Sequence, residues 1–252
     1  MGVKFDLNDG VALLTIDRPQ ARNAIDGATA LAMSELIQRV NSDRDIRVAV
    51  LTGSGGHFCA GMDLKAFLRG EVTRLPEVGF AGVTQARICK PLIAAIEGYA
   101  LAGGFEIALA CDLIVAAEDA KFGLTEVKRG LVANAGGLVR LPRQLPRKIA
   151  SELVLTGEIY PASLLSQHGL INRLVPSGEA LNAALGLARH IAANGPLAVA
   201  VSKQVLSESQ DWPSTEMFDR QNLLTAPVFK SADAREGARA FAEKRTPIWR
   251  GE

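Results

Sequence analysis

The sequence lacks the charge excess that marks several classes of binding protein. Its 252 residues include 28 Lys and Arg against 27 Asp and Glu, for a formal net charge of +1. Proteins that bind nucleic acid or a membrane surface usually carry a strong basic bias, so this balance argues against both kinds of partner. Any positive patch for an anionic ligand must therefore be local.

Cysteine is scarce and odd in number, and its three positions, Cys59, Cys89 and Cys111, are widely spaced. This usage favours free thiols in a reducing cytoplasm over a disulfide framework. The sequence also lacks a clustered set of metal ligands and a convincing dinucleotide-binding fingerprint. We therefore expect neither a metal nor a redox cofactor.

Long uninterrupted apolar runs are absent too. The most apolar stretch, residues 91–111, contains Glu97, Glu106 and a Gly pair, and a membrane-spanning helix does not readily hold such carboxylates. The N-terminus carries Asp6 and lacks the apolar core of a secretory signal. We interpret the stretch as buried core and expect a cytoplasmic protein with no membrane partner.

Hydrophobic residues make up 48% of the sequence, which is enough for a full core and for some contact between subunits. In the first half, short β-type runs alternate with helical patterns, which is typical of an α/β domain. Asp26 is a candidate N-cap for a helix whose apolar residues recur at helical spacing as far as Val40. Strands are predicted over residues 11–16, 48–51, 92–96 and 113–116.

Beyond about Pro142 the pattern becomes helical, with Gly157, Gly169 and Gly195 as breaks. No flexible linker or internal repeat separates this part from the rest. We assign residues 1–190 to a core body and residues 191–252 to a C-terminal helical region that packs on the body or on a neighbouring subunit. Helices are predicted over residues 149–156, 163–168, 181–194, 197–207 and 232–244.

Two Gly-rich segments predict exposed backbone N–H groups. Residues 53–56 lead from a predicted strand towards Met62 and Asp63, and such a turn can bind an anion, although for this segment alone a plain tight connection is the better explanation. The pair Gly103-Gly104 begins an apolar helical run and places Glu106 in its first turn. An acid there suits the helix dipole, but in apolar surroundings it needs a partner or a raised pKa.

Three segments, in this order, resemble the signature segments of the enoyl-CoA hydratase (crotonase) superfamily. They are residues 59–65, residues 102–106 and residues 122–126, and the Glu that ends the third lies 20 residues after the Glu that ends the second, as in enoyl-CoA hydratases. Similar segments occur at residues 17–24, 155–157, 169–175 and 241–245, so the resemblance covers nearly the whole chain. It implies a spiral of β-β-α units followed by a C-terminal helical trimerisation region.

The resemblance also implies roles for individual residues. Backbone N–H groups of Met62 and Gly103 would polarise a thioester carbonyl, and Glu106 and Glu126 would hold a water molecule as an acid–base pair. Coenzyme A, as part of the substrate, would be bound by residues of the first segments and of the last helix, which in many relatives comes from a neighbouring subunit. These residues are Arg22, Ala60, Asp63, Leu64, Lys65, Phe241 and Lys244.

We therefore expect an enoyl-CoA hydratase that works as a homotrimer or a dimer of trimers. A crotonobetainyl-CoA-type hydratase uses the same chemistry, an enoyl-CoA isomerase would need one of the carboxylates, and a non-catalytic acyl-CoA-binding protein would need neither. The segment 130–137 departs from the common family pattern, because Ala133 stands where Pro is frequent. The acyl group therefore stays open at this stage.

Overall fold

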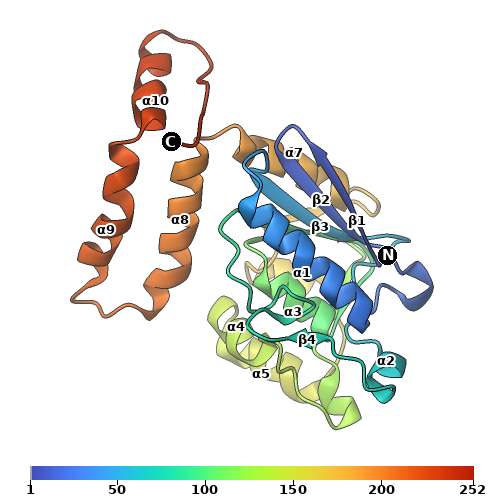
Figure 1. Cartoon of the computed structure of the whole chain (residues 1–252). Coiled ribbons are helices and arrows are strands. Elements are labelled where there is room, and N and C mark those ends of the chain that lie inside the picture. The colour runs from blue at the N-terminus through green and yellow to red at the C-terminus, as the bar shows by residue number, and fades with distance from the viewer. Residues whose placement is uncertain (1) are drawn as a thin grey trace.

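The structure, a computed structural model, describes residues 2–252 (Figure 1). Its centre is a six-stranded sheet in the order β1-β2-β3-β6-β8-β11. The first pair is antiparallel and the remaining pairs are parallel. The strands are β1 (Val3–Asn8), β2 (Val11–Ile16), β3 (Val48–Gly53), β6 (Leu92–Ile96), β8 (Leu113–Ala117) and β11 (Arg173–Val175). The four strands predicted from sequence are confirmed.

A smaller sheet, in the order β10-β9-β7, lies beside the first. Its strands are β7 (Tyr99–Leu101), β9 (Lys121–Gly123) and β10 (Tyr160–Pro161), and Cys59 pairs with Ala100 as an isolated bridge. Successive chain segments therefore visit the large sheet, the small sheet and then a helix. This is the spiral of β-β-α units that the resemblance implied. A two-stranded ribbon of β4 (Arg74–Leu75) and β5 (Gly79–Phe80) completes the strands.

Helices cover both faces of the large sheet. Helix α1 (Gly27–Ser42) begins where predicted, with Asp26 Oδ1 accepting from the Thr29 N–H at 2.9 Å. The side chains of β3 alternate, so that Leu51 faces the core shared with α1 and Val50 faces the cluster formed with α7 (Ala180–Ala192). The other body helices are α2 (Leu64–Leu68), α3 (Gly103–Ala110), α4 (Gly137–Gln144), α5 (Arg147–Thr156) and α6 (Ala162–Gln167).

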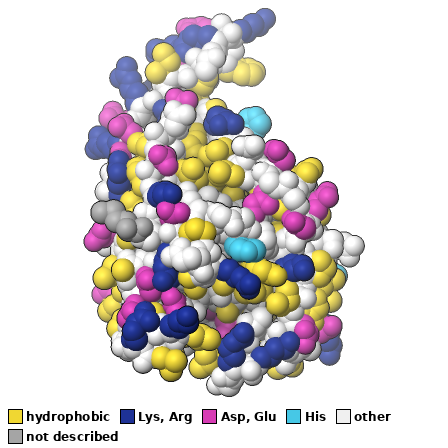
Figure 2. All heavy atoms as spheres, turned by 90° about the vertical axis from the view of Figure 1, so that its right-hand side faces the viewer, with side chains coloured by type: hydrophobic (Ala, Val, Ile, Leu, Met, Phe, Trp, Pro, Cys, Tyr) yellow, Lys and Arg dark blue, Asp and Glu magenta, His cyan; other side chains and the backbone are white. Residues whose placement is uncertain are grey.

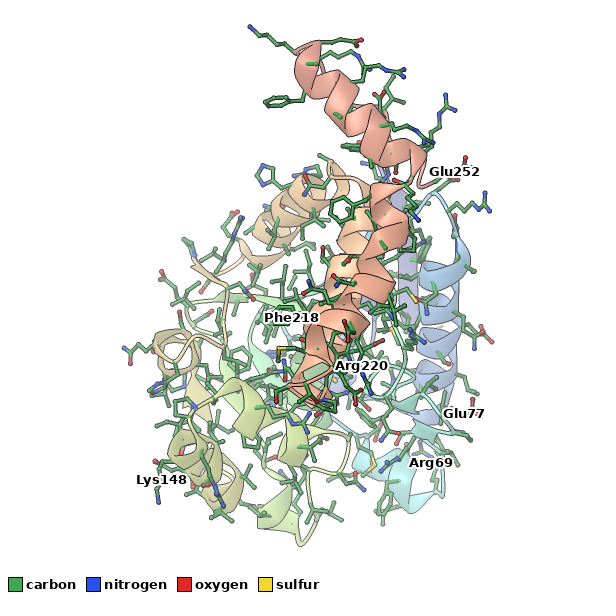
Figure 3. The ribbon with its side chains drawn as sticks, turned by 90° about the vertical axis from the view of Figure 1, so that its left-hand side faces the viewer. Arg69, Glu77, Lys148, Phe218, Arg220 and Glu252 are labelled. Atoms are coloured by element: carbon green, nitrogen blue, oxygen red, sulfur yellow. The ribbon has the colours of Figure 1, made fainter. Side chains whose placement is uncertain are left out.

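The last three helices form an arm that extends away from the body (Figure 1). They are α8 (Pro196–Glu208), α9 (Met217–Phe229) and α10 (Ala232–Ala242). Neither α8 nor α9 buries a residue. Lys203 Nζ ties α8 to the body by an ion pair with Asp112 Oδ2 at 2.7 Å. Figure 3 looks onto α9 and its exposed Phe218.

The division at residue 190 falls two residues before α7 ends, and α7 packs on the sheet. The arm that follows is tied to the body by polar contacts of Lys203 with Asp112 and with Lys90 O. Its assignment as a region that packs on the body or on a neighbouring subunit stays a prediction.

Several elements, including β1 and the short strands of the two smaller sheets, were not predicted, and three others show why a prediction fails. Both α4 and α9 contain a proline, Pro142 and Pro227, and proline inside a helix removes a backbone hydrogen bond, which argues against a helix from sequence. The third is β11, which adds a parallel strand from within the part predicted as wholly helical. It is three residues long, too short for a pattern to show.

No helix within residues 2–252 has both the length and the apolarity needed to cross a membrane. On the face drawn in Figure 2, basic and acidic side chains are interspersed with apolar ones. This mixture matches the balanced composition.

Candidate active site

Glu106 lies in the first turn of α3 and is only 3% exposed. Its Oε1 accepts hydrogen bonds from the backbone N–H groups of Ala135 and Gly137, both at 2.8 Å. Burial raises the pKa of Glu106 to about 7, and the charge of Glu126 adds to the rise, while the two N–H donors and Arg140 oppose it. A carboxyl group with this pKa can release or take up a proton near neutral pH.

Glu126 begins the 3₁₀ turn Glu126–Arg129, which follows the end of β9 at Gly123 after a short connection. Its Oε2 is buried and has no hydrogen-bond partner among residues 2–252. Burial raises the pKa of this carboxyl group as well. Because the charge of Glu126 raises the pKa of the buried Glu106, the two carboxyl groups cannot both ionise cheaply, and the pair is suited to hold one proton.

The hydrogen bonds of Gly61 and Asp63 fix the direction in which the Met62 N–H points. The Ile25 N–H donates to Gly61 O at 2.8 Å, and the Asp63 N–H donates to Ile25 O at 2.9 Å. Because neighbouring peptide groups in an extended segment point to opposite sides, the Met62 N–H points away from Ile25. Within the described chain it has no acceptor.

The Gly103 N–H opens α3 and, as the first residue of a helix, has no partner within it. The residue before it, Ala102, has φ +49° and ψ −126°, a conformation that L-residues rarely adopt. A Cβ atom on Gly61 would lie 3.0 Å from Gly103 N and 3.0 Å from Ala102 Cβ. The two segments therefore touch, and both free N–H groups lie where they meet.

The proposed coenzyme A residues separate into two groups. Asp63 caps α2 by accepting from the N–H groups of Lys65 and Ala66 at 3.0 and 3.2 Å, and the Ala60 N–H donates to Arg22 O at 3.0 Å. Arg22, Ala60, Asp63, Leu64 and Lys65 thus belong to one connected region beside Met62.

Phe241 and Lys244 belong to the second group. They lie at the end of α10 in the arm, at the opposite end of the molecule from α2 in Figure 1. Phe241 is 88% exposed. Within one copy of the chain, these two residues are not brought to the site.

Sequence reasoning missed the residues that hold these groups in place. The N–H donors of Ala135 and Gly137 lie 29 and 31 residues from Glu106 along the chain. The Gly136-Gly137 pair was the one visible signal, because glycine permits close backbone approach. The guanidinium of Arg140 also lies in this region, and that of Arg18 binds both Asp26 and Asp63.

Comparisons with known proteins give a consistent result. The family model for enoyl-CoA hydratase/isomerase matches residues 6–252. A carnitinyl-CoA dehydratase of Salmonella paratyphi A is 42% identical over 255 residues, covering 97% of this chain and 96% of that protein.

Two solved structures extend this result. The crystal structure of an enoyl-CoA hydratase from Mycobacterium marinum superposes with a TM-score of 0.98 at 50% identity, covering 100% and 99% of the two chains. That of a carnitinyl-CoA hydratase from Mycobacterium avium gives a TM-score of 0.80 at 48% identity, with the same coverage.

Proposed function

This chain belongs to the enoyl-CoA hydratase/isomerase family, and on that premise we propose that it adds water across the 2,3 double bond of an enoyl-CoA thioester. The observation that carries the proposal is the pair of carboxyl groups on the buried Glu106 and the half-buried Glu126, both with raised pKa values. They accompany two unpaired backbone N–H groups where the segments at Gly61 and Gly103 meet.

The N–H groups of Met62 and Gly103 act on the thioester oxygen. When water adds to the β-carbon, negative charge develops on this oxygen as the thioester becomes an enolate. Two donors aimed at it in advance stabilise that charge, and the loss of one such donor typically costs about 3 kcal/mol. Because both donors are backbone groups, their direction depends on the fold and not on the side chain of Met62.

The two glutamates move the protons. The ionised member of the pair removes a proton from the water whose oxygen attacks the β-carbon, and the protonated member delivers a proton to the α-carbon. One proton enters the pair and one leaves it, so each addition preserves its total protonation. A shared proton and a pKa of about 7 at Glu106 suit this exchange.

Coenzyme A binds along the region that contains Ala60 and the start of α2, with the Arg22 cation available for a phosphate. Phe241 and Lys244 contribute from another copy of the chain, because their own arm holds them at the far end of the molecule. This part of the proposal requires an oligomer, as does the exposed apolar surface of the arm.

The same chemistry on a crotonobetainyl-CoA-type substrate is the second candidate. It is supported by the carnitinyl-CoA dehydratase that is 42% identical and by the carnitinyl-CoA hydratase structure at 48% identity. Isomerisation of a 3-enoyl-CoA would need a single carboxylate to carry the proton. The presence of two glutamates with raised pKa values therefore favours hydration.

The test is loss of enoyl absorbance with crotonyl-CoA, decenoyl-CoA and crotonobetainyl-CoA, using the parent, Glu106→Gln and Glu126→Gln. We expect hydration by the parent and a loss of about 10²-fold or more in kcat in each variant. Because Gln keeps the shape of Glu, thioester binding by calorimetry should be retained in both variants. Binding without turnover of any of the three by the parent would overturn the proposal, and conversion of a 3-enoyl-CoA alone would establish the isomerase.

A further inference from the structure

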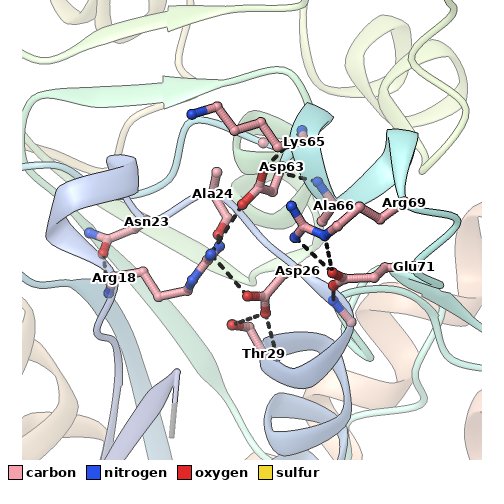
Figure 4. A network of polar contacts seen from close by, with 12 residues as sticks. Arg18, Asn23, Ala24, Asp26, Thr29, Asp63, Lys65, Ala66, Arg69 and Glu71 are labelled. Carbon is pink, nitrogen blue, oxygen red and sulfur yellow. Dashed lines mark hydrogen bonds and ion pairs between the residues drawn. The ribbon is translucent and has the colours of Figure 1, made fainter.

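The guanidinium group of Arg18 links the chain segment at Ala24 and Asp26 to the segment at Asp63 (Figure 4). Arg18 Nη2 lies 2.9 Å from Asp26 Oδ2 and 3.1 Å from Asp63 Oδ2, and Arg18 Nη1 donates to Ala24 O. The Arg18 side chain is 17% exposed. It therefore binds three groups in a setting where water competes weakly.

Each of the two carboxylates uses one oxygen to cap a helix and the other to bind Arg18. Asp26 Oδ1 accepts from the Thr29 N–H and caps α1, and Asp63 Oδ1 accepts from the Lys65 and Ala66 N–H groups and caps α2. The other oxygen of each binds Arg18. The cation thus joins the starts of two helices that are 37 residues apart along the chain.

Between these capped ends lies the isolated parallel bridge of Ile25 and Met62. The groups held by Arg18 belong to Ala24 and Asp26 on one segment and to Asp63 on the other. They are the immediate neighbours of the two bridge residues. Any change in the separation of the segments therefore changes the direction of the Met62 N–H.

Charge makes this linkage necessary. Burial acts to raise the pKa of Asp63, but hydrogen bonds from the Ala66 N–H and Arg18 hold it below its usual value, and the pKa of Asp26 is likewise lowered. Both carboxylates are therefore ionised at neutral pH. Without the cation between them, they would repel each other across the bridge.

We propose that Arg18 is a positioning residue that aims the Met62 N–H at the thioester oxygen by holding the segments at Asp26 and Asp63 together. The proposal rests on the oxyanion role given to Met62 above. Arg18 itself makes no contact with the reacting atoms. It acts through two helix caps and one backbone bridge.

Kinetics of Arg18→Gln test the proposal. We expect kcat for enoyl-CoA hydration to fall roughly 30-fold while KM changes less than about 3-fold, because the interaction lost is made mainly in the transition state. Arg18→Lys keeps the charge but loses the planar fork, and we expect a loss of about 5-fold. The matched control is Arg69→Gln, which removes a neighbouring exposed ion pair with Glu71 and should change kcat less than about 2-fold.

A second substitution separates positioning from general stability. In Arg18→Gln/Asp63→Asn the repulsion is removed while Asn still caps α2, so we expect kcat to rise above that of Arg18→Gln without reaching that of the parent, because the contacts of the guanidinium stay lost. A kcat for Arg18→Gln within about 2-fold of the parent would overturn the proposal. The proposal would also be overturned if kcat fell and KM rose by similar factors in Arg18→Gln and the double variant showed no recovery of kcat.

Binding measurements keep the proposal testable without turnover. Acetoacetyl-CoA can place an enolate oxygen between the two N–H groups, whereas coenzyme A alone cannot. By calorimetry, the preference of Arg18→Gln for acetoacetyl-CoA over coenzyme A should fall roughly 10-fold from the parent value. An unchanged preference refutes the role of Arg18. Absence of hydration by the parent, with the preference lowered in the variant, refutes the proposed reaction alone.

Discussion

The Gly137 N–H donates to Glu106 Oε1 at 2.8 Å, and a methyl group on Gly137 would lie 3.1 Å from the same oxygen. The site therefore uses the N–H of this residue and the absence of its side chain together. The same methyl group would lie 2.9 Å from Leu124 Cδ1 and 3.0 Å from Ala133 Cβ. To make room for it, the side chain of Leu124, the carboxylate of Glu106 or the segment at Ala133 would have to shift.

Gly137→Ala is accordingly expected to lower kcat for hydration about 10-fold, because it moves the donors of Glu106 by a few tenths of an ångström or more. Gly186→Ala on α7 is the matched control, since a methyl group there meets nothing within 4 Å. This control should keep full activity and gain about 0.5–1 kcal/mol in the free energy of unfolding. Equal activity of the two variants would contradict the role of the Gly137 contact.

Glu106 makes the stability of the protein depend on pH. Its pKa is raised from 4.5 to about 7 by burial, so the folded state holds a proton that the unfolded chain releases. The resulting stabilisation is complete below about pH 4.5 and is lost as pH rises through about 7, a change of roughly 3 kcal/mol.

Glu106→Gln cannot ionise and should escape this loss. Urea unfolding should therefore show the variant gaining stability relative to the parent between pH 5 and pH 8, by about 2–3 kcal/mol. A difference between variant and parent that stays constant over this range would show that Glu106 has an ordinary pKa.

Arg140 should set the pH at which the acid–base pair works. Its positive charge lowers the pKa of Glu106, against the effects of burial and of Glu126. Arg140→Met removes that charge and should move the corresponding apparent pKa in the kcat/KM profile upwards, while Arg140→Lys should move it less.

Arg143 provides the matched control for Arg140. Both line a hollow of about 410 Å³ next to the segment 133–139, but Arg143 is exposed and pairs with Asp211. Arg143→Met should leave the pH profile of kcat/KM unchanged. Equal shifts in both variants would indicate a general loss of positive charge, and not a specific effect on Glu106.

Ala102 stores backbone strain directly before Gly103. A residue with a Cβ at φ +49° is strained, whereas glycine adopts this conformation freely. Ala102→Gly should therefore raise the free energy of unfolding by about 1 kcal/mol, measured by urea unfolding, with hydration activity changed less than about 3-fold. Destabilisation by a similar amount would show that the Ala102 methyl contributes more through packing than its backbone costs.

The arm should be covered in solution. Phe218, Leu223, Phe229 and Phe241 are 69%, 77%, 81% and 88% exposed in a single copy, and soluble proteins rarely leave so many large apolar side chains in water. Sedimentation should give a mass near three or six times 26.7 kDa. Leu223→Glu with Phe229→Glu should lower that mass, while Leu206→Glu on α8 tests how far the contact extends.

Parts of the fold follow from local sequence. The sequence predicts the buried runs of β2, β3, β6 and β8 and the helix cap at Asp26, because each of these patterns is contained within a few consecutive residues. Helix α4 was hidden by Pro142, whose packing context outweighs its unfavourable effect on the helix.

The candidate site divides in the same way. Glu106 and Glu126 were recognised by resemblance, because their surroundings in sequence are distinctive only in combination. The donors at Ala135 and Gly137 and the linkage through Arg18 join segments about 30 to 45 residues apart, with no periodicity to reveal them. Such contacts are properties of the folded spiral and not of any one segment.

The spiral also separates what this fold must keep from what it can vary. Met62 follows Cys59 and Gly103 follows Ala100 at the same short separation along the chain. Because Cys59 pairs with Ala100, strand pairing fixes the distance between the N–H groups of Met62 and Gly103. Residues 130–134, which precede the donors to Glu106, and the arm lie outside that ladder of paired strands. Mutation can therefore change these parts while the spacing of the two N–H groups stays constant, so that new substrates or partners can evolve on an unaltered frame of paired strands.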